Sequence, residues 1–283
     1  MSLLQLAIIA LLQGTTEWLP VSSSGHVLLA AGFFEASPGD ELLINAVSNL
    51  GTLLAMLIYF RKDVTSAIAG GFELVAAPVS KSPLSKGARL AAAVIVATPV
   101  AVLVAFAYEK FLPDSMLESM RSIYVVAATT IIFGALLWWA DVKGTRDRKE
   151  EDMTMWHAFL IGATQAIAAI LPGTSRSGIT MTAARAFGYD RTEAARFSML
   201  IGAPILAAAG LYGAMGLVTA DATETVLTLK DGLIVASIAF ITGLASIWFL
   251  MSLLSRMSFL PFVLYRFALG AVLILGSPLV GLL

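Results

Sequence analysis

The chain has 283 residues, of which 58% are hydrophobic and only 13% are charged. A soluble protein carries about 25% charged residues, so this composition and the mean hydropathy of +0.87 exclude an ordinary soluble domain. The apolar residues come in long blocks, which indicates a polytopic membrane protein. The net charge of −1 argues against a nucleic-acid partner, and the lack of cysteine excludes disulfides and thiolate chemistry.

The first apolar stretch, residues 3–34, is interrupted at its centre by Gln13, Glu17, Pro20 and three serines. It lacks the basic start of a signal peptide, so we expect it to remain in the mature protein. A spanning helix needs about 20 apolar residues, and each half of this stretch is shorter. We therefore predict a re-entrant helix hairpin. Three uninterrupted blocks follow it, at about 42–60, 88–108 and 122–140, with a charged loop expected at 61–87.

The second half repeats this order after a charged loop at 141–154. An interrupted stretch at 155–187 precedes blocks at about 197–217, 232–254 and 262–281. A shift of 152 positions lays Gln13 on Gln165, Pro20 on Pro172 and Ser23 on Ser175. Because each half crosses the membrane an odd number of times, the second half must be inverted relative to the first.

The predicted fold is therefore an all-α polytopic membrane protein with a single membrane domain over residues 1–283. Its inverted-topology repeats cover about 1–140 and 155–283, and each contains a re-entrant hairpin and three transmembrane helices. Most basic residues lie in the loops 61–87 and 141–154 and in the turn 188–196. The positive-inside rule makes that face cytoplasmic, so we expect both termini outside.

The first break, from Gln13 to His26, concentrates polar side chains that are costly inside a membrane and are usually functional there. Gln13 and Glu17 share one face of a helix. After Pro20 ends that helix, the serines at 22–24 offer caps for the next half-helix, and we expect Ser22 or Ser24 to be only a cap. His26 lies within reach of these serines, and a serine beside a histidine is the minimum for an activated oxygen nucleophile.

The second break contains Thr174, Ser175 and Ser177 and adds Arg176. Two half-helix N-termini, a guanidinium and several hydroxyls at one point indicate an anion site, above all for phosphate. Glu17 does not suit a phosphate, but it suits Mg²⁺ or Ca²⁺, which bridge carboxylate and phosphate oxygens. His157 follows Trp156 at the edge of the charged loop, and we interpret it as structural.

At these residues the chain resembles the undecaprenyl-pyrophosphate phosphatase family of the bacitracin-resistance type. The resemblance rests on Gln13, Glu17 and the Pro-Val-Ser-Ser-x-Gly-His run ending at His26, and on the Pro-Gly-x-Ser-Arg-Ser-Gly run over 172–178. Segments 50–63 and 189–210 also read like the family. The family has the role of hydrolysing the terminal phosphate of a C55 polyprenyl pyrophosphate with a divalent cation, which regenerates the lipid carrier for cell-wall synthesis.

The resemblance implies a role for each motif residue. Ser23 would be the nucleophile, His26 its base or an alternative nucleophile, and Glu17 with Gln13 the cation site. Phosphate would bind to the polar residues of the second break and to one serine of the first, namely Arg176, Ser175, Thr174, Ser177 and Ser22. Many members have Glu where this chain has Gln13, so Glu17 must hold more of the metal. The expected partners are a lipid pyrophosphate and the bilayer, with a homodimer as one option for assembly. The resemblance also implies a location in the bacterial cytoplasmic (inner) membrane.

Two other classes of membrane protein share some of these features. Lipid phosphatases with a Lys-x6-Arg-Pro motif also contain Ser-Gly-His and Ser-Arg strings, but that motif and its downstream histidine are absent here, since His26 and His157 are the only histidines. A polyprenyl-phosphate flippase or secondary transporter could use the same inverted repeat with broken helices. Glu17, Ser23 and His26 together favour the enzyme, because a carrier needs binding groups but no nucleophile.

Overall fold

The computed structural model describes residues 2–34, 38–76, 83–219 and 228–276. The first half of the chain forms α1 (Leu3–Thr16), α2 (Ser23–Phe33), α3 (Pro38–Tyr59), α4 (Arg61–Ala76), α5 (Lys86–Ala97), α6 (Pro99–Phe111), α7 (Asp114–Met120) and α8 (Ile123–Lys143). The second half forms the 3-10 turn η1 (Glu150–Asp152) and then α9 (Met155–Ala163), α10 (Gln165–Ile170), α11 (Arg176–Ala186), α12 (Arg191–Thr219), α13 (Leu229–Leu254) and α14 (Leu260–Gly276).

Four helices in the described residues are long and apolar enough to cross a membrane: Lys86–Tyr108, Ile123–Lys143, Arg191–Leu211 and Leu229–Leu254. A fifth candidate is the pair Ile44–Tyr59 and Arg61–Ala76, which bends by 89° between its two parts. The prediction of an all-helical multi-pass membrane protein is confirmed. The sixth expected block, 262–281, coincides with α14, of which only the part up to Gly276 lies in the described residues.

The stretch 61–76, which we expected to be a loop, is instead the helix α4. This helix packs on α5 with almost no side chain between the two backbones. A Cβ added to Gly70 would lie 2.1 Å from the carbonyl carbon of Gly87, and one added to Gly87 would lie 2.2 Å from the carbonyl oxygen of Ser66. The close backbone packing that these glycines allow gives α4 a surface to fold against, and the sequence pattern gave no sign of it.

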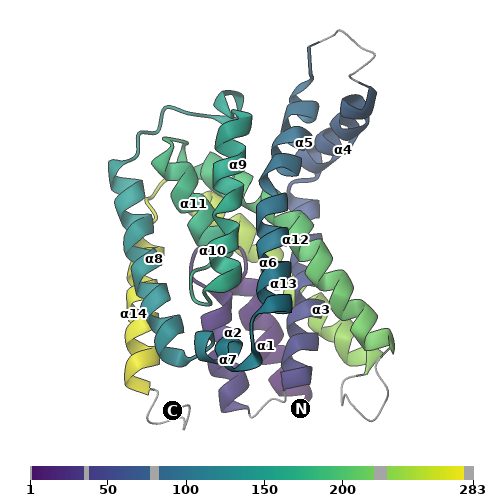
Figure 1. Ribbon diagram of the computed structural model, residues 1–283, viewed down its shortest axis with the longest axis vertical. Helices are drawn as coiled ribbons and strands as arrows, with labels where there is room; N and C mark the ends of the chain where they lie inside the picture. The colour runs from purple at the N-terminus through teal and green to yellow at the C-terminus, as the bar shows by residue number, and fades with distance from the viewer. Residues whose placement is uncertain (1, 35–37, 77–82, 220–227, 277–283) are drawn as a thin grey trace.

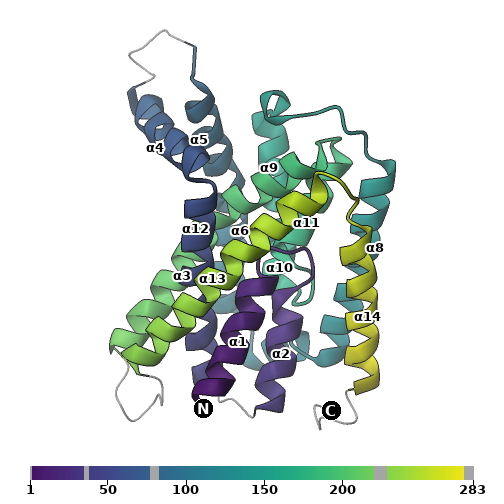
Figure 2. The same cartoon turned by 180° about the vertical axis from the view of Figure 1, so that it is seen from behind.

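The two interrupted stretches come from opposite ends of the molecule (Figures 1 and 2). The hairpin α1–α2 lies at the end where α14 finishes, whereas α9 and α11 reach the opposite end, beside the link between α8 and α9. The predicted helix–break–helix pattern is present in both, with an additional break at Thr164 between α9 and α10. The turns after Thr16 and Ile170 therefore lie in the interior of the bundle.

Helix α13 is the main support of the first hairpin. A Cβ on Gly14 of α1 would lie 2.8 Å from the Cα of Ala239, and one on Gly51 of α3 would lie 2.3 Å from the carbonyl oxygen of Ala236. Both helices therefore touch the backbone of α13 directly. Just beyond α1, Trp18 is fully buried and its indole N–H donates to the carbonyl of Thr52 at 3.1 Å. These contacts fix the chain where it enters the first break.

A buried carboxylate ties four helices together at the other end of the molecule. Asp141 of α8 accepts hydrogen bonds from Arg185 of α11 at 3.0 Å and from Arg191 of α12 at 2.7 Å. It also accepts one from the backbone N–H of Phe259, directly before α14. Because a buried charge is stable only when it is paired, this cluster holds the ends of α8, α11, α12 and α14 in place.

Candidate active site

The two breaks have the same local backbone shape. Ser22 and Ser175 adopt φ values of 73° and 68°, a left-handed conformation that is uncommon for residues other than glycine. Each lies directly before a half-helix, α2 or α11. In each, the hydroxyl lies close to that of the serine two positions on, at 3.0 Å for Ser24 and 3.2 Å for Ser177. In the structure Ser22 is thus the equivalent of Ser175. The alignment of the sequence had placed Ser23 opposite Ser175, which is one position away.

Hydrogen bonds run from each break to the backbone of the other. The Ser24 hydroxyl of the first break accepts from the N–H of Gly173 at 3.1 Å. The Ser177 hydroxyl of the second break donates to the carbonyl of Leu19 at 3.0 Å. The breaks are therefore in direct contact, and the two serines that connect them hold equivalent positions within their half-helices.

Arg266 of α14 joins the two breaks from a third direction. This side chain is fully buried, and its guanidinium donates to the carbonyls of Pro20 at 3.3 Å, Gly173 at 3.0 Å and Thr174 at 3.0 Å. Its Nε donates to the carbonyl of Thr130 at 2.9 Å. Arg266 was not among the site residues predicted from the sequence. A charged residue inside the apolar block 262–281 was a signal that could have identified it.

Glu17 is the centre of the polar side chains. Its Oε1 accepts from Arg176 at 3.0 Å, which is an ion pair between the two breaks. Its Oε2 accepts from the Ser23 hydroxyl at 2.9 Å and from the Gln13 amide at 3.0 Å. Gln13 donates its second amide hydrogen to Asn49 of α3 at 3.0 Å. No acidic residue lies near Arg176 in the sequence, so this ion pair could not be predicted from spacing.

The guanidinium of Arg176 also stacks over the ring of Trp18, with 5.1 Å between its central carbon and the ring centroid. One of its terminal nitrogens, Nη1, is buried and has no hydrogen-bond partner among the described residues. An unpaired buried donor costs about 1–3 kcal/mol and more when it is charged. Arg176 is therefore held by Glu17 and Trp18 while it keeps a donor for a ligand.

The expected contact between Ser23 and His26 is not formed. The helix α2 does begin at Ser23, but the Nδ1 of His26 turns back to the carbonyl of Ser22 at 2.8 Å. Its Nε2 lies 2.5 Å from the hydroxyl of Tyr265 on α14. The contact that a proton transfer from Ser23 to His26 needs is therefore absent from this arrangement, because both ring nitrogens are engaged elsewhere and Glu17 holds the serine.

The other expected phosphate ligands have different surroundings. The Thr174 hydroxyl is buried and has no partner in the described part of the chain. Ser22 is also buried, and its hydroxyl lies against that of Ser24. Ser175 caps α11 by accepting from the N–H of Gly178 at 3.1 Å, and Ser177 binds the first break. The structure thus engages Ser22, Ser175 and Ser177 in contacts within the protein and leaves Thr174 and Arg176 with unused groups.

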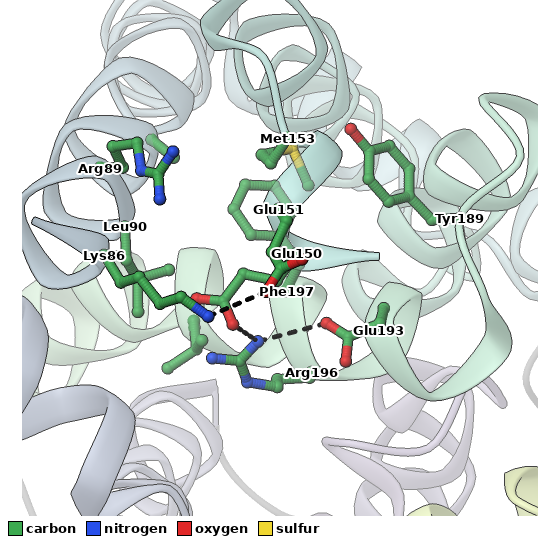
Figure 3. Close-up of a pocket in the computed structure, with 12 residues that line it drawn as sticks. Lys86, Arg89, Leu90, Glu150, Glu151, Met153, Tyr189, Glu193, Arg196 and Phe197 are labelled. Atoms are coloured by element: carbon green, nitrogen blue, oxygen red, sulfur yellow. Dashed lines mark hydrogen bonds and ion pairs between the residues drawn. The ribbon is translucent and has the colours of Figure 1, made fainter. Parts of the chain in front are cut away.

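A separate pocket lies at the end of the molecule opposite the first hairpin, and none of the residues of the breaks line it (Figure 3). Two of the three cations that line it are paired with its carboxylates. Lys86 lies 2.9 Å from Glu151, and Arg196 bridges Glu150 at 2.9 Å and Glu193 at 3.2 Å. The carboxylates therefore already occupy Lys86 and Arg196, whereas Arg89, which also lines the pocket, has no ion pair among the described residues. Next to this region, Nδ1 of His157 is hydrogen-bonded to the hydroxyl of Tyr189 at 2.8 Å, which agrees with a structural role.

Comparison with known proteins places the chain in a family. Residues 6–272 match the family described as bacitracin resistance protein BacA. The undecaprenyl-diphosphatase of Hyphomonas neptunium is 64% identical over 280 residues, which are 99% of this chain and 98% of that protein. The undecaprenyl-diphosphatases of Maricaulis maris and Alteromonas mediterranea are 44% and 40% identical over 97% of this chain and 98% of their own lengths. The chain belongs to the BacA family of bacitracin resistance proteins.

Proposed function

We propose that this protein is a membrane phosphatase that hydrolyses undecaprenyl pyrophosphate to undecaprenyl phosphate and inorganic phosphate. The observation that carries the proposal is the connected set of Ser23, Glu17 and Arg176 where the two breaks meet. It combines a hydroxyl, a proton acceptor and a cation with a spare donor at one point. Relatives named undecaprenyl-diphosphatase over nearly the whole chain support the substrate. Recycling this carrier would support cell-wall synthesis and bacitracin resistance.

The contacts suggest how the reaction proceeds. The Ser23 oxygen attacks the terminal phosphorus, its proton passes to Oε2 of Glu17, and the bond to the bridging oxygen breaks. Undecaprenyl phosphate leaves, and water then attacks the phosphoserine to release inorganic phosphate. Arg176 and the N–H groups at the starts of α2 and α11 stabilise the charge on the transferred phosphoryl group. Direct attack by a water held by Glu17 is the alternative route.

A divalent cation, Mg²⁺ or Ca²⁺, is compatible with the side chains at this point. The described residues contain no group of three or more His, Asp or Glu residues that could hold a metal. Glu17 keeps one of a carboxylate's four lone-pair sites, and Gln13, which uses both amide hydrogens, keeps its carbonyl oxygen. Mg²⁺ commonly binds one or two carboxylates together with substrate phosphates. When bound, it would neutralise charge on the phosphate oxygens.

We also propose that the chain is one membrane domain made of inverted repeats, residues 1–140 and 155–283, each with a re-entrant hairpin. The matching conformations of Ser22 and Ser175 support this, as do the reciprocal bonds of Ser24 and Ser177. The placement of the hairpins at opposite ends agrees with it (Figure 2). Basic loops at the end away from α1 favour an inner-membrane protein with both termini outside. Cysteine labelling from each side tests this in a chain without cysteine.

Purified protein in detergent should release inorganic phosphate from undecaprenyl pyrophosphate. Glu17→Gln, Ser23→Ala and Arg176→Ala should each lower kcat by about 10²–10³, the usual cost of losing a transition-state contact. Arg256→Ala and Ser237→Ala, which change exposed residues away from the breaks, are the controls. Phosphate release is measured together with the thermal unfolding temperature of each variant.

Normal turnover in Arg176→Ala would contradict the site assignment. No phosphate release by the unmodified protein would contradict the enzyme and would favour the flippase or transporter, because detergent removes any gradient that a transporter needs.

Gly202→Ala should weaken pyrophosphate binding without any change to a polar residue. A Cβ on Gly202 of α12 would lie 1.5 Å from Nη1 and 2.6 Å from the central guanidinium carbon of Arg176, so the guanidinium would have to shift from its place beside Glu17. The loss of one charge-assisted hydrogen bond between Arg176 and pyrophosphate, about 1.5–3 kcal/mol, predicts about a 10- to 150-fold weaker binding of pyrophosphate. Titration calorimetry with inorganic pyrophosphate measures it. Gly71→Ala on α4, where an added Cβ meets nothing within 4 Å, should bind normally. Equal affinity in both variants would contradict this position of Arg176.

Removal of divalent cations should stop phosphate release. EDTA should abolish turnover, and added Mg²⁺ or Ca²⁺ should restore it. Glu17→Gln should need a higher cation concentration for half-maximal rate, because Glu17 is the carboxylate proposed to hold the cation. Full activity in EDTA would show that Arg176 and the half-helix N-termini are sufficient without a metal.

A further inference from the structure

The hydroxyl of Tyr265 lies 2.5 Å from Nε2 of His26. The two rings are stacked, with centroids 5.5 Å apart and an angle of 7° between their planes. They come from helices far apart in the chain, His26 from α2 and Tyr265 from α14. His26 is buried, whereas Tyr265 is 47% exposed. The pair therefore connects the interior of the first break with the outside of α14.

The partner of the other nitrogen decides where the protons lie. Nδ1 of His26 is 2.8 Å from the carbonyl oxygen of Ser22, and a carbonyl can only accept. Nδ1 must therefore carry a hydrogen. In the neutral ring, Nε2 is then the unprotonated nitrogen and accepts the O–H of Tyr265. This combination fixes one of the two tautomers that a free histidine samples.

The position of Tyr265 is itself fixed by its neighbour on α14. Arg266 donates to Pro20 of the first break and to Gly173 and Thr174 of the second. Any movement of α14 would break these bonds inside the bundle. The Tyr265 ring is consequently held at a constant distance from the first break, as a positioning group requires.

We propose that Tyr265 is a positioning residue that acts through His26. It holds the imidazole in the Nδ1–H tautomer by donating its hydroxyl to Nε2, and it stacks on the ring to fix the direction in which Nδ1–H points to the carbonyl of Ser22. This rests on the proposed phosphatase function. It gives His26 a role other than deprotonating Ser23, whose hydroxyl belongs to Glu17: the fixed imidazole holds the carbonyl of Ser22, and with it the backbone directly before Ser23.

Kinetics test whether Tyr265 acts through His26. Tyr265→Phe removes the hydroxyl and keeps the stacked ring. It should lower kcat for phosphate release about tenfold, leave KM within twofold and alter the pH profile of kcat. In a His26→Gln background the same change should have no further effect, because coupled residues are not additive. Tyr59→Phe at the end of α3 is the control and should behave as the unmodified protein. Normal kcat in Tyr265→Phe, or losses that multiply in the double variant, would overturn the proposal.

Nitrogen NMR tests the contact without any substrate. The chain has two histidines, so ¹⁵N-histidine labelling gives two imidazoles, and a His157→Gln variant assigns them. His26 should show the Nδ1–H tautomer, and its Nε2 resonance should move in Tyr265→Phe towards that of an imidazole nitrogen without a hydrogen bond. An Nε2–H tautomer or an unmoved resonance would overturn the proposal. Absent phosphate release by the unmodified protein would instead overturn the phosphatase function, so the two failures are distinguishable.

Discussion

The two breaks leave backbone carbonyl and N–H groups without helical partners in the interior of an apolar bundle, and the structure is organised around satisfying them. A membrane interior offers no water for this purpose. Arg266 supplies donors to carbonyls of both breaks. Thr129 and Thr130 of α8 add donors to the carbonyls of Pro172 and Gly173. The cost of burying a guanidinium without a carboxylate is offset by these acceptors, and removing it would leave both breaks unsupported.

The same constraint explains why the site chemistry gathers at this point. A break in a helix exposes N–H groups at the start of the next half-helix, which favours anions. The two halves then differ in what they add. The first supplies Glu17, Ser23 and His26, and the second supplies Arg176. Gln13 is bonded to Glu17 and Asn49, whereas the buried amide of Gln165, its counterpart, has no partner among the described residues. The two breaks therefore have the same backbone geometry but carry different reactive side chains.

Much of this could be predicted from the sequence because the signals were local. Long apolar blocks identified the helices, and polar residues within them identified both breaks, Glu17, Ser23 and Arg176. Contacts between distant segments could not be predicted. The ion pair of Arg176 with Glu17 joins residues that lie in different halves, and the partner of His26 lies on the last helix. A three-residue spacing suggested a contact between Ser23 and His26, but the side-chain directions decided otherwise. The helix α4 was missed because glycine packing, not hydrophobic periodicity, makes it possible.

The terminal phosphate of the substrate is expected to bind where the two breaks meet. A structure of the protein with a non-hydrolysable pyrophosphate lipid and Mg²⁺ would show where this phosphate lies. The terminal phosphorus should lie beside the Ser23 oxygen, a phosphate oxygen should accept from Nη1 of Arg176, and any cation should lie on Glu17. A pyrophosphate bound elsewhere, for example in the pocket of Lys86 and Arg196 at the other end of the molecule, with Arg176 still without a ligand, would contradict it.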